Sequence, residues 1–107
     1  MTPRPKIGEV FMVDLGYAGK VRPVVVMSRE DPEAPRAVAL CVPLTSQLRG
    51  SSYEVTMPRV PWLKLQSYAN VQGIGSAQFH ELCDKRGRFE PAVISKIKDA
   101  IRFAFDL

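Results

Sequence analysis

One arginine interrupts the most apolar segment of the chain. Residues 21–28 (Val-Arg-Pro-Val-Val-Val-Met-Ser) are typical of a buried strand, and Arg22 stands near its beginning. A guanidinium there would lie at the mouth of the strand with its head toward a groove, where its planar fork suits a phosphate. The alternative is a structural salt bridge, for instance with Asp14 or Glu9.

Three polar side chains follow a second apolar segment. Residues 36–42 are predicted to form a strand that closes at Pro43, and Thr45, Ser46 and Gln47 come directly after it. Loops at strand ends are where a scaffold places binding and catalytic side chains. The Thr45 hydroxyl could be one of these working side chains, or it could simply bond the backbone of its own turn.

Other patterns of chemical interest are incomplete in this sequence. Residues 16–20 (Gly-Tyr-Ala-Gly-Lys) lack the spacing and the hydroxyl residue of a phosphate-binding loop. Cys41 and Cys83 are too few and too far apart for a zinc site, so we expect two free thiols, no metal and no other cofactor. His80 is interpreted as structural or exposed, with a role as an auxiliary acid or base as the alternative.

Short strands must position these residues. Besides the two segments above, strand patterns cover residues 7–15, 52–57, 68–74 and 77–82. Beyond them, apolar residues recur at spacings of three and four from Pro91 to Asp106, which predicts one helix with Pro91 in its first turn. Five or six antiparallel strands followed by one helix predict a mainly β fold, a small antiparallel barrel with a C-terminal α-helix.

Length and composition limit what such a fold can hold. The chain has 107 residues, of which 46% are hydrophobic and 24% charged, and we expect a single domain over residues 1–107. No apolar run is long enough for a membrane span and no signal-peptide pattern is evident, so a cytoplasmic location is expected. The net charge of +4 favours a polyanionic partner, although charge alone leaves nucleic acid undecided.

The chain resembles the PemK/MazF family of toxin endoribonucleases, which come from bacterial toxin–antitoxin pairs. Five short motifs carry the resemblance in the family's order and together span nearly the whole chain: Gly8-Glu-Val-Phe-Met-Val-Asp-Leu, Arg22-Pro-Val-Val-Val-Met-Ser, Pro43-Leu-Thr-Ser-Gln, Ser67-Tyr-Ala-Asn-Val-Gln-Gly-Ile and Arg86-Gly-Arg-Phe. The family's fold, an SH3-like barrel with a C-terminal helix, agrees with the periodicity.

The resemblance implies metal-independent, sequence-specific cleavage of single-stranded RNA. In that reaction the ribose 2′-OH attacks the adjacent phosphate and leaves a 2′,3′-cyclic phosphate and a 5′-OH. The family's working residues are the Arg of its Arg-Pro motif and the Thr of its Pro-x-Thr motif, so Arg22 and Thr45 are expected to be catalytic. Five further side chains are expected to bind the RNA: Tyr17, Lys20, Ser46, Gln47 and Gln72.

The resemblance also implies partners. A homodimer with the RNA groove along its interface is expected, as is an acidic cognate antitoxin whose carboxylates could occupy the phosphate positions. Two alternatives stay open, namely a non-catalytic toxin of the same fold that binds a protein such as gyrase, and a silent nucleic-acid-binding barrel. The sequence departs from many relatives in the short turn at residues 16–20 and over residues 77–82, which leaves the base preference open and gives His80 a place as an auxiliary acid or base.

Overall fold

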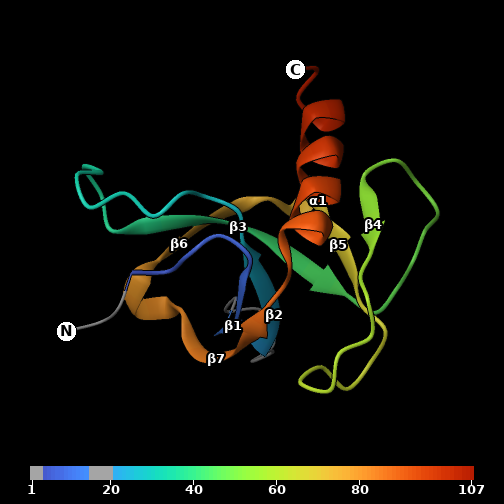
Figure 1. Cartoon of the computed structure of the whole chain (residues 1–107), viewed down its shortest axis with the longest axis horizontal. Helices are drawn as coiled ribbons and strands as arrows, with labels where there is room; N and C mark the ends of the chain where they lie inside the picture. The colour runs from blue at the N-terminus through green and yellow to red at the C-terminus, as the bar shows by residue number, and fades with distance from the viewer. Residues whose placement is uncertain (1–3, 15–20) are drawn as a thin grey trace.

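A single helix packs across a curled sheet in the computed structural model, which describes residues 4–14 and 21–107 (Figure 1). The mainly β class with a C-terminal helix is confirmed. Within the described residues the elements follow in the order β1 (Glu9–Asp14), β2 (Val21–Val26), β3 (Val38–Thr45), β4 (Glu54–Thr56), β5 (Tyr68–Asn70), η1 (Val71–Gly73), β6 (Gly75–Gln78), η2 (Phe79–Glu81), β7 (Cys83–Arg88) and α1 (Pro91–Ala104).

All strand pairings in the sheet are antiparallel. The strand order is β4-β5-β3-β2-β1-β7, and β6 pairs with the first half of β3 while β5 pairs with its last two residues. Between the described residues no pairing joins β4 to β7. The sheet therefore curls as a barrel does but stays open between these two strands.

The strand β3 continues through Pro43, so the predicted end of the strand at this residue is wrong. Pro43 pairs with Val24 of β2. On its other side it falls between Cys41, the last residue paired with β6, and Leu44, the first paired with β5. A proline is tolerated there because no neighbouring strand needs its missing N–H. As a result Thr45 lies on the strand itself and not in a loop beyond it.

Two other predicted strand segments have a different extent in the structure, and one strand was not predicted. The segment 68–74 splits into β5 and η1, because the Asn70 side chain accepts a hydrogen bond from the Gln72 N–H and turns the chain. The segment 77–82 is only partly a strand, since β6 begins and ends earlier and η2 follows it. The strand β7 was not predicted at all. Its sequence, Cys-Asp-Lys-Arg-Gly-Arg, has no apolar alternation because this strand lies at the edge of the sheet with its side chains mostly exposed.

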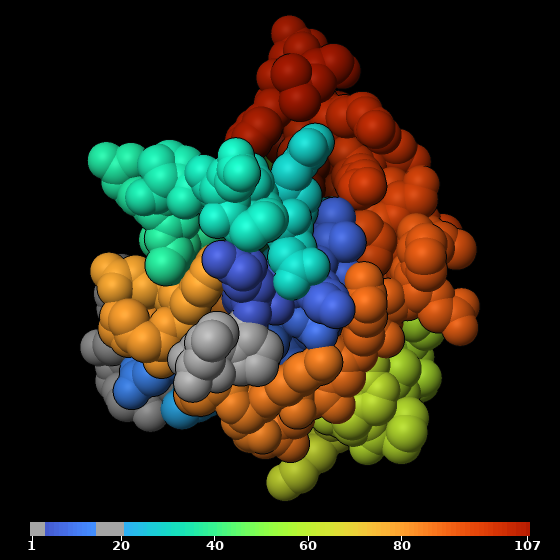
Figure 2. Space-filling view, turned by 60° about the vertical axis from the view of Figure 1, so that its left-hand side comes forward, coloured from blue at the N-terminus to red at the C-terminus, as the bar shows by residue number. Residues whose placement is uncertain are grey.

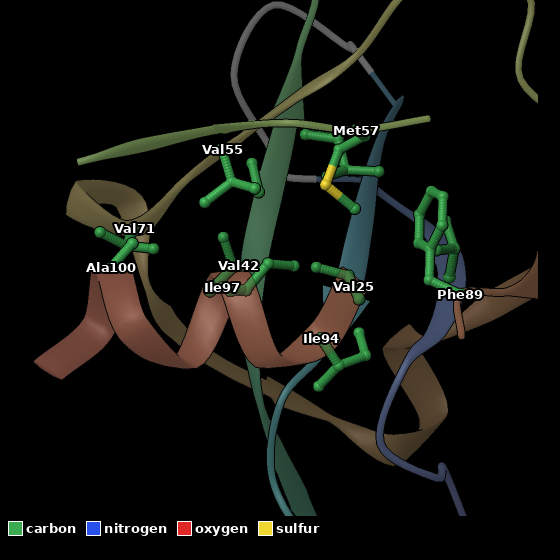
Figure 3. Close-up of a cluster of buried hydrophobic side chains, with 12 residues drawn as sticks. Val25, Val42, Val55, Met57, Val71, Phe89, Ile94, Ile97 and Ala100 are labelled. Atoms are coloured by element: carbon green, nitrogen blue, oxygen red, sulfur yellow. The ribbon is translucent and has the colours of Figure 1, made fainter. Parts of the chain in front are cut away.

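Both faces of β2 are buried, which explains its continuous run of valines. Val25 lies on the face beneath α1, whereas Val24 and Val26 belong to a second cluster on the opposite face. The predicted apolar stripe of the helix is confirmed, and the helix ends two residues earlier than expected. Figure 3 shows the stripe and the buried side chains around it: Ile94, Ile97 and Ala100 of α1, with Val25, Val42, Val55, Met57, Val71 and Phe89.

Within the described residues, α1 is the single α-helix, and it is too short and too polar to cross a membrane.

Candidate functional site

Arg22 and Thr45 line the same pocket, which has a volume of about 340 Å³ and lies at the ends of β2 and β3. The ladder between these strands pairs Val25 with Val42 and Val24 with Pro43. Arg22 and Thr45 each lie two residues beyond the pair of Val24 and Pro43, which is the last pair of this ladder. Antiparallel pairing therefore brings together the two side chains that were predicted to be catalytic.

The Arg22 guanidinium is exposed and forms no ion pair with a described residue. Glu9, one of the two carboxylates considered as a partner, pairs with Lys85 instead, with 2.5 Å between Oε2 and Nζ. Asp14, the other, stands across from Val21 in the β1–β2 ladder. The guanidinium is thus available for an anion that enters the pocket.

The Thr45 hydroxyl is held in a defined orientation. Its Oγ1 accepts a hydrogen bond of 3.1 Å from the backbone N–H of Gln47. This is the local turn bond that the sequence left as an alternative to a functional role. The bond uses an acceptor lone pair and leaves the O–H hydrogen free to be donated. The two interpretations are compatible, because the turn aims the hydroxyl that an anion would bind.

Three side chains of this pocket were missed by the sequence analysis. Trp62, Lys64 and Arg86 line it together with Arg22 and Thr45. Lys64 and Arg86 are exposed cations, so the pocket gathers three positive side chains together with the hydroxyls of Thr45, Ser46 and Ser67. The Arg-Gly-Arg-Phe motif could have pointed to Arg86. Trp62 and Lys64 lie in the long loop between β4 and β5, which has no periodicity that could have placed them.

Trp62 forms one wall of the pocket and is firmly packed. Its ring lies 4.9 Å, centroid to centroid, from the ring of Phe89. It also covers Gly87 so closely that a Cβ atom at that position would lie 2.4 Å from Trp62 Cε2. Arg86, next to Gly87, is held by Asp84 at 2.7 Å. The positions of the Trp62 ring and of the Arg86 side chain in the pocket therefore depend on β7.

A second pocket adjoins the first and shares Thr45 with it. Its volume is about 270 Å³, and polar side chains dominate its lining: Thr45, Gln47, Arg49, Ser51, Glu54, Asn70 and Gln72. The Glu54 carboxylate organises one side. It accepts hydrogen bonds from the Arg49 N–H at 2.9 Å and from the Ser51 N–H and hydroxyl at 2.8 Å each. The Arg49 N–H bond and the Ser51 bonds hold the pKa of Glu54 below its ordinary value, so it stays charged.

The residues predicted to bind RNA are distributed over both pockets. Ser46 lines the first pocket, and Gln47 and Gln72 line the second. Tyr17 and Lys20 lie outside the described residues. The three that are described therefore line pockets that Thr45 also lines, and their binding of RNA stays a prediction.

His80 is not brought to either pocket. It is exposed in η2, with its Nε2 2.5 Å from Gln78 Oε1, and Gln78 pairs with Val38 at the far end of β3. Seven steps along β3 separate Val38 from Thr45, which at ~3.3 Å per residue is roughly 23 Å. Within residues 4–14 and 21–107, no three His, Cys, Asp or Glu side chains gather in a way that could hold a metal ion.

Comparison with known proteins gives consistent matches along the chain. Residues 6–105 match a family described as PemK-like, MazF-like toxin of type II toxin–antitoxin system. The chain is 33% identical over 108 residues to the probable endoribonuclease MazF5 of Mycobacterium tuberculosis, with 99% of this chain and 97% of that protein covered. Two solved structures are also similar: an endoribonuclease in complex with its cognate antitoxin from Mycobacterial species (TM-score 0.84, 30% identity, 96% of each chain) and an endoribonuclease from Mycobacterial species (TM-score 0.82, 28% identity, 100% of this chain and 96% of that one).

Proposed function

Because the chain belongs to the PemK-like, MazF-like family of endoribonuclease toxins of type II toxin–antitoxin systems, we propose that it cleaves single-stranded RNA in the pocket that holds Arg22 and Thr45. The observation that carries this proposal is that these two residues line one pocket at the ends of β2 and β3. One supplies an exposed guanidinium that no described residue neutralises, and the other supplies a hydroxyl aimed by its own turn.

In the proposed reaction the RNA supplies its own nucleophile. The 2′-oxygen forms a bond to the adjacent phosphorus while the bond from phosphorus to the 5′-oxygen breaks. The proton lost by the 2′-OH is balanced by the proton that the leaving 5′-oxygen gains, and the products are a 2′,3′-cyclic phosphate and a 5′-OH. Negative charge gathers on the non-bridging oxygens in the pentavalent transition state. A fixed cation with several N–H donors is therefore the group that the reaction needs most.

Arg22 acts in this proposal as the electrostatic clamp. A guanidinium can hold two phosphate oxygens at once, and these charge-assisted hydrogen bonds are stronger than neutral ones. Thr45 is a positioning donor and not a base, because a hydroxyl is a poor base and its Oγ1 already accepts the Gln47 N–H. Lys64 and Arg86 add charge for the phosphates on either side of the scissile bond.

The adjoining pocket suits a base next to the scissile phosphate. Asn70 Oδ1 is occupied by the Gln72 N–H at 3.1 Å, so the Asn70 NH₂ group remains to be donated. The amides of Gln47 and Gln72 and the Arg49 guanidinium line the same pocket. Amide and guanidinium groups read the edges of unstacked bases in single-stranded RNA. The sequence preference of cleavage therefore depends on these side chains.

We further propose that the protein acts as a homodimer that a cognate antitoxin neutralises. The relative with 30% identity was solved with its cognate antitoxin, which supports this partner. Large apolar side chains are exposed at the end of α1, and they are suited to a contact between two copies: Phe103, Phe105 and Leu107. A monomer in sedimentation at micromolar concentration would contradict the dimer.

The decisive experiment is incubation of the purified protein with long RNA of varied sequence in excess EDTA. We expect discrete fragments that carry 5′-OH and 2′,3′-cyclic phosphate ends. Trp62 is the only tryptophan in the sequence and lines the pocket, so its fluorescence can report RNA binding by an Arg22→Ala variant. RNA that stays intact at micromolar protein would contradict the proposal and favour the non-catalytic, protein-binding alternative.

A further inference from the structure

The pocket that holds Arg22 and Thr45 also carries apolar surface that a phosphate does not need. Two large apolar side chains of its lining, Val21 and Leu65, are 52% and 65% exposed. Trp62 belongs to the same lining and is half-buried. Apolar side chains that are exposed together at one site indicate a surface that a ligand or a partner covers. The ligand of this pocket should therefore bring an apolar face as well as negative charge.

Trp62 lies with one face of its indole against β7. A Cβ atom added at Gly87 would lie closest to the Cε2 and Cδ2 atoms of Trp62. These two atoms are shared by both rings of the indole and have no free edge, so Gly87 approaches them through the face of the ring system. A glycine allows this close approach because it has no side chain. Figure 2 shows part of the loop that contains Trp62 (residues 57–67, yellow-green) lying against β7 (orange).

The indole is held on another side by Phe89, yet part of it reaches solvent. The Phe89 ring is tilted by 53° to the indole and is itself buried in the core. The Nε1 atom of Trp62 donates no hydrogen bond to a described residue. Among those residues no buried side-chain nitrogen or oxygen lacks a partner, so Nε1 is in contact with solvent. The indole is thus fixed by the protein and accessible from the pocket that it lines.

We propose that Trp62 is a stacking platform for one of the two bases that flank the scissile phosphate. This inference rests on the proposed function in taking single-stranded RNA as the ligand. Proteins bind the unstacked bases of single strands by stacking them on aromatic side chains. Arg22 and Thr45 would hold the phosphate on the same lining, so a base of an adjoining nucleotide is the apolar group that meets the indole.

The two pockets that meet at Thr45 would then treat the two flanking bases differently. The adjoining pocket is lined by polar side chains, which read the hydrogen-bonding edge of a base. The pocket of Trp62 offers an aromatic face, which tolerates any base because every base has a face to stack. Cleavage should therefore be selective for the base at one flanking position and tolerant at the other. Purines should be favoured at the tolerant position, since their stacking face is larger.

The first test measures stacking without cleavage and uses the wild-type protein. The ligand is a 2′-O-methyl RNA oligonucleotide of adenines, whose blocked 2′-oxygen cannot attack the phosphate. It is compared with the same backbone without bases. Trp62 is the only tryptophan in the sequence, so tryptophan fluorescence reports on this ring. The adenine oligonucleotide should quench the fluorescence, whereas the abasic one, which brings the same phosphates, should not. Equal quenching by both would overturn the inference.

Substitutions at Trp62 test the platform through affinity and cleavage. Trp62→Leu keeps an apolar side chain but no aromatic face, so it should raise the Kd of the adenine oligonucleotide about tenfold. The Kd of the abasic oligonucleotide should change by about twofold or less. Trp62→Phe keeps an aromatic face and should restore most of the affinity. Because stacking holds substrate and transition state alike, Trp62→Leu should raise the KM for RNA cleavage with little change in kcat.

A matched aromatic residue controls for general effects on packing. Tyr53 is half-buried and contacts the Phe103 ring, but it lines neither pocket. Tyr53→Leu should therefore leave the Kd of both oligonucleotides and the KM within about twofold of the wild type. Circular dichroism checks that each variant is folded, and the fluorescence comparison decides the question where Trp62→Leu is not.

The outcomes distinguish this inference from the proposed function. A wild-type protein that cleaves no RNA but is quenched by the adenine oligonucleotide alone would refute the endoribonuclease activity and support the platform. A Trp62→Leu variant with an unchanged Kd for the adenine oligonucleotide would overturn the platform. An equal loss of affinity for both oligonucleotides would overturn it as well, because Trp62 would then act only by supporting the fold of the pocket.

Discussion

Arg22 and Thr45 line the same pocket, and each lies two residues beyond Val24 and Pro43, the last pair of the ladder between β2 and β3. The ladder that sets this relationship is among the most buried parts of the molecule, because β2 packs a hydrophobic cluster against each of its faces. Strands positioned in this way hold side chains more rigidly than a loop does. The placement of the strand ends that carry Arg22 and Thr45 is thus set by the core.

Substitutions at Arg22 and Thr45 should separate what the guanidinium charge contributes to the cleavage rate from what the hydroxyl contributes. We expect Arg22→Ala to lower the rate of RNA cleavage by about 10²–10³, the typical effect of losing one transition-state donor. Thr45→Ser, which keeps the hydroxyl and its turn bond, should retain most of the rate that Thr45→Val loses. Single-turnover assays measure the rate of RNA cleavage directly for each variant. Arg36→Ala, at an exposed arginine outside the pockets described here, is the control, and equal loss in that variant would contradict the assignment.

The contact between Gly87 and Trp62 should make this glycine irreplaceable. A Cβ at Gly87 would meet three ring atoms of Trp62 at 2.4–2.8 Å, and the packed ring has little room to move. Gly87→Ala should therefore lower the free energy of unfolding by about 1–3 kcal/mol. Gly75→Ala is the matched control, because its Cβ would meet nothing closer than 3.9 Å. Urea denaturation measures both, and equal midpoints for the two variants would show that Trp62 adapts.

Glu9 should make stability depend on acid pH. Burial raises its pKa, but the hydrogen bond and charge of Lys85, the Lys6 N–H and the charge of Arg88 together hold that pKa below its ordinary value of 4.5. The folded protein thus binds this proton less tightly than the unfolded chain does. The stabilisation is present above the unfolded pKa and is lost as the pH falls through the folded pKa.

Comparing variants isolates the contribution of Glu9. Between pH 5 and pH 3 the unfolding free energy of the wild type should fall more steeply than that of Glu9→Gln. At pH 7 the variant should be less stable by about 1–3 kcal/mol, the effect of losing charged hydrogen bonds. Glu33→Gln, in the exposed loop after β2, should keep the wild-type slope. Parallel pH profiles for wild type and Glu9→Gln would refute the role of this carboxylate.

The two thiols should react very differently. Burial raises the pKa of Cys41 to about 11, so at pH 8 only ~10⁻³ of it is thiolate. Cys83 is exposed on the edge strand β7. Brief treatment of the native protein with iodoacetamide should therefore alkylate Cys83 alone, and both residues should react after denaturation. Peptide mass spectrometry identifies the sites, and rapid native labelling of Cys41 would indicate that this part of the core opens readily.

Where the hydrophobic pattern was local and strong, the sequence alone was sufficient to predict the helix or strand. The spacing of Ile94, Ile97 and Ala100 predicted the buried stripe of α1, and the valine run predicted a buried strand, which the structure shows to be covered on both faces. Arg22 and Thr45 were singled out because each is a polar residue beside a strongly apolar strand. Their side-by-side placement needed only one further fact, the pairing of β2 with β3.

Tertiary structure decided everything that depends on which strand lies beside which. The edge strand β7 has no local hydrophobic pattern because most of its side chains face solvent, yet pairing with β1 brings Arg86 into the pocket of Arg22 and Thr45. The loop that supplies Trp62 and Lys64 gains its place from packing against β7 and not from any periodicity. Local sequence therefore indicated most of the strands and singled out Arg22 and Thr45, whereas the pairing of distant strands brought these two residues to one pocket and left His80 at the far end of β3.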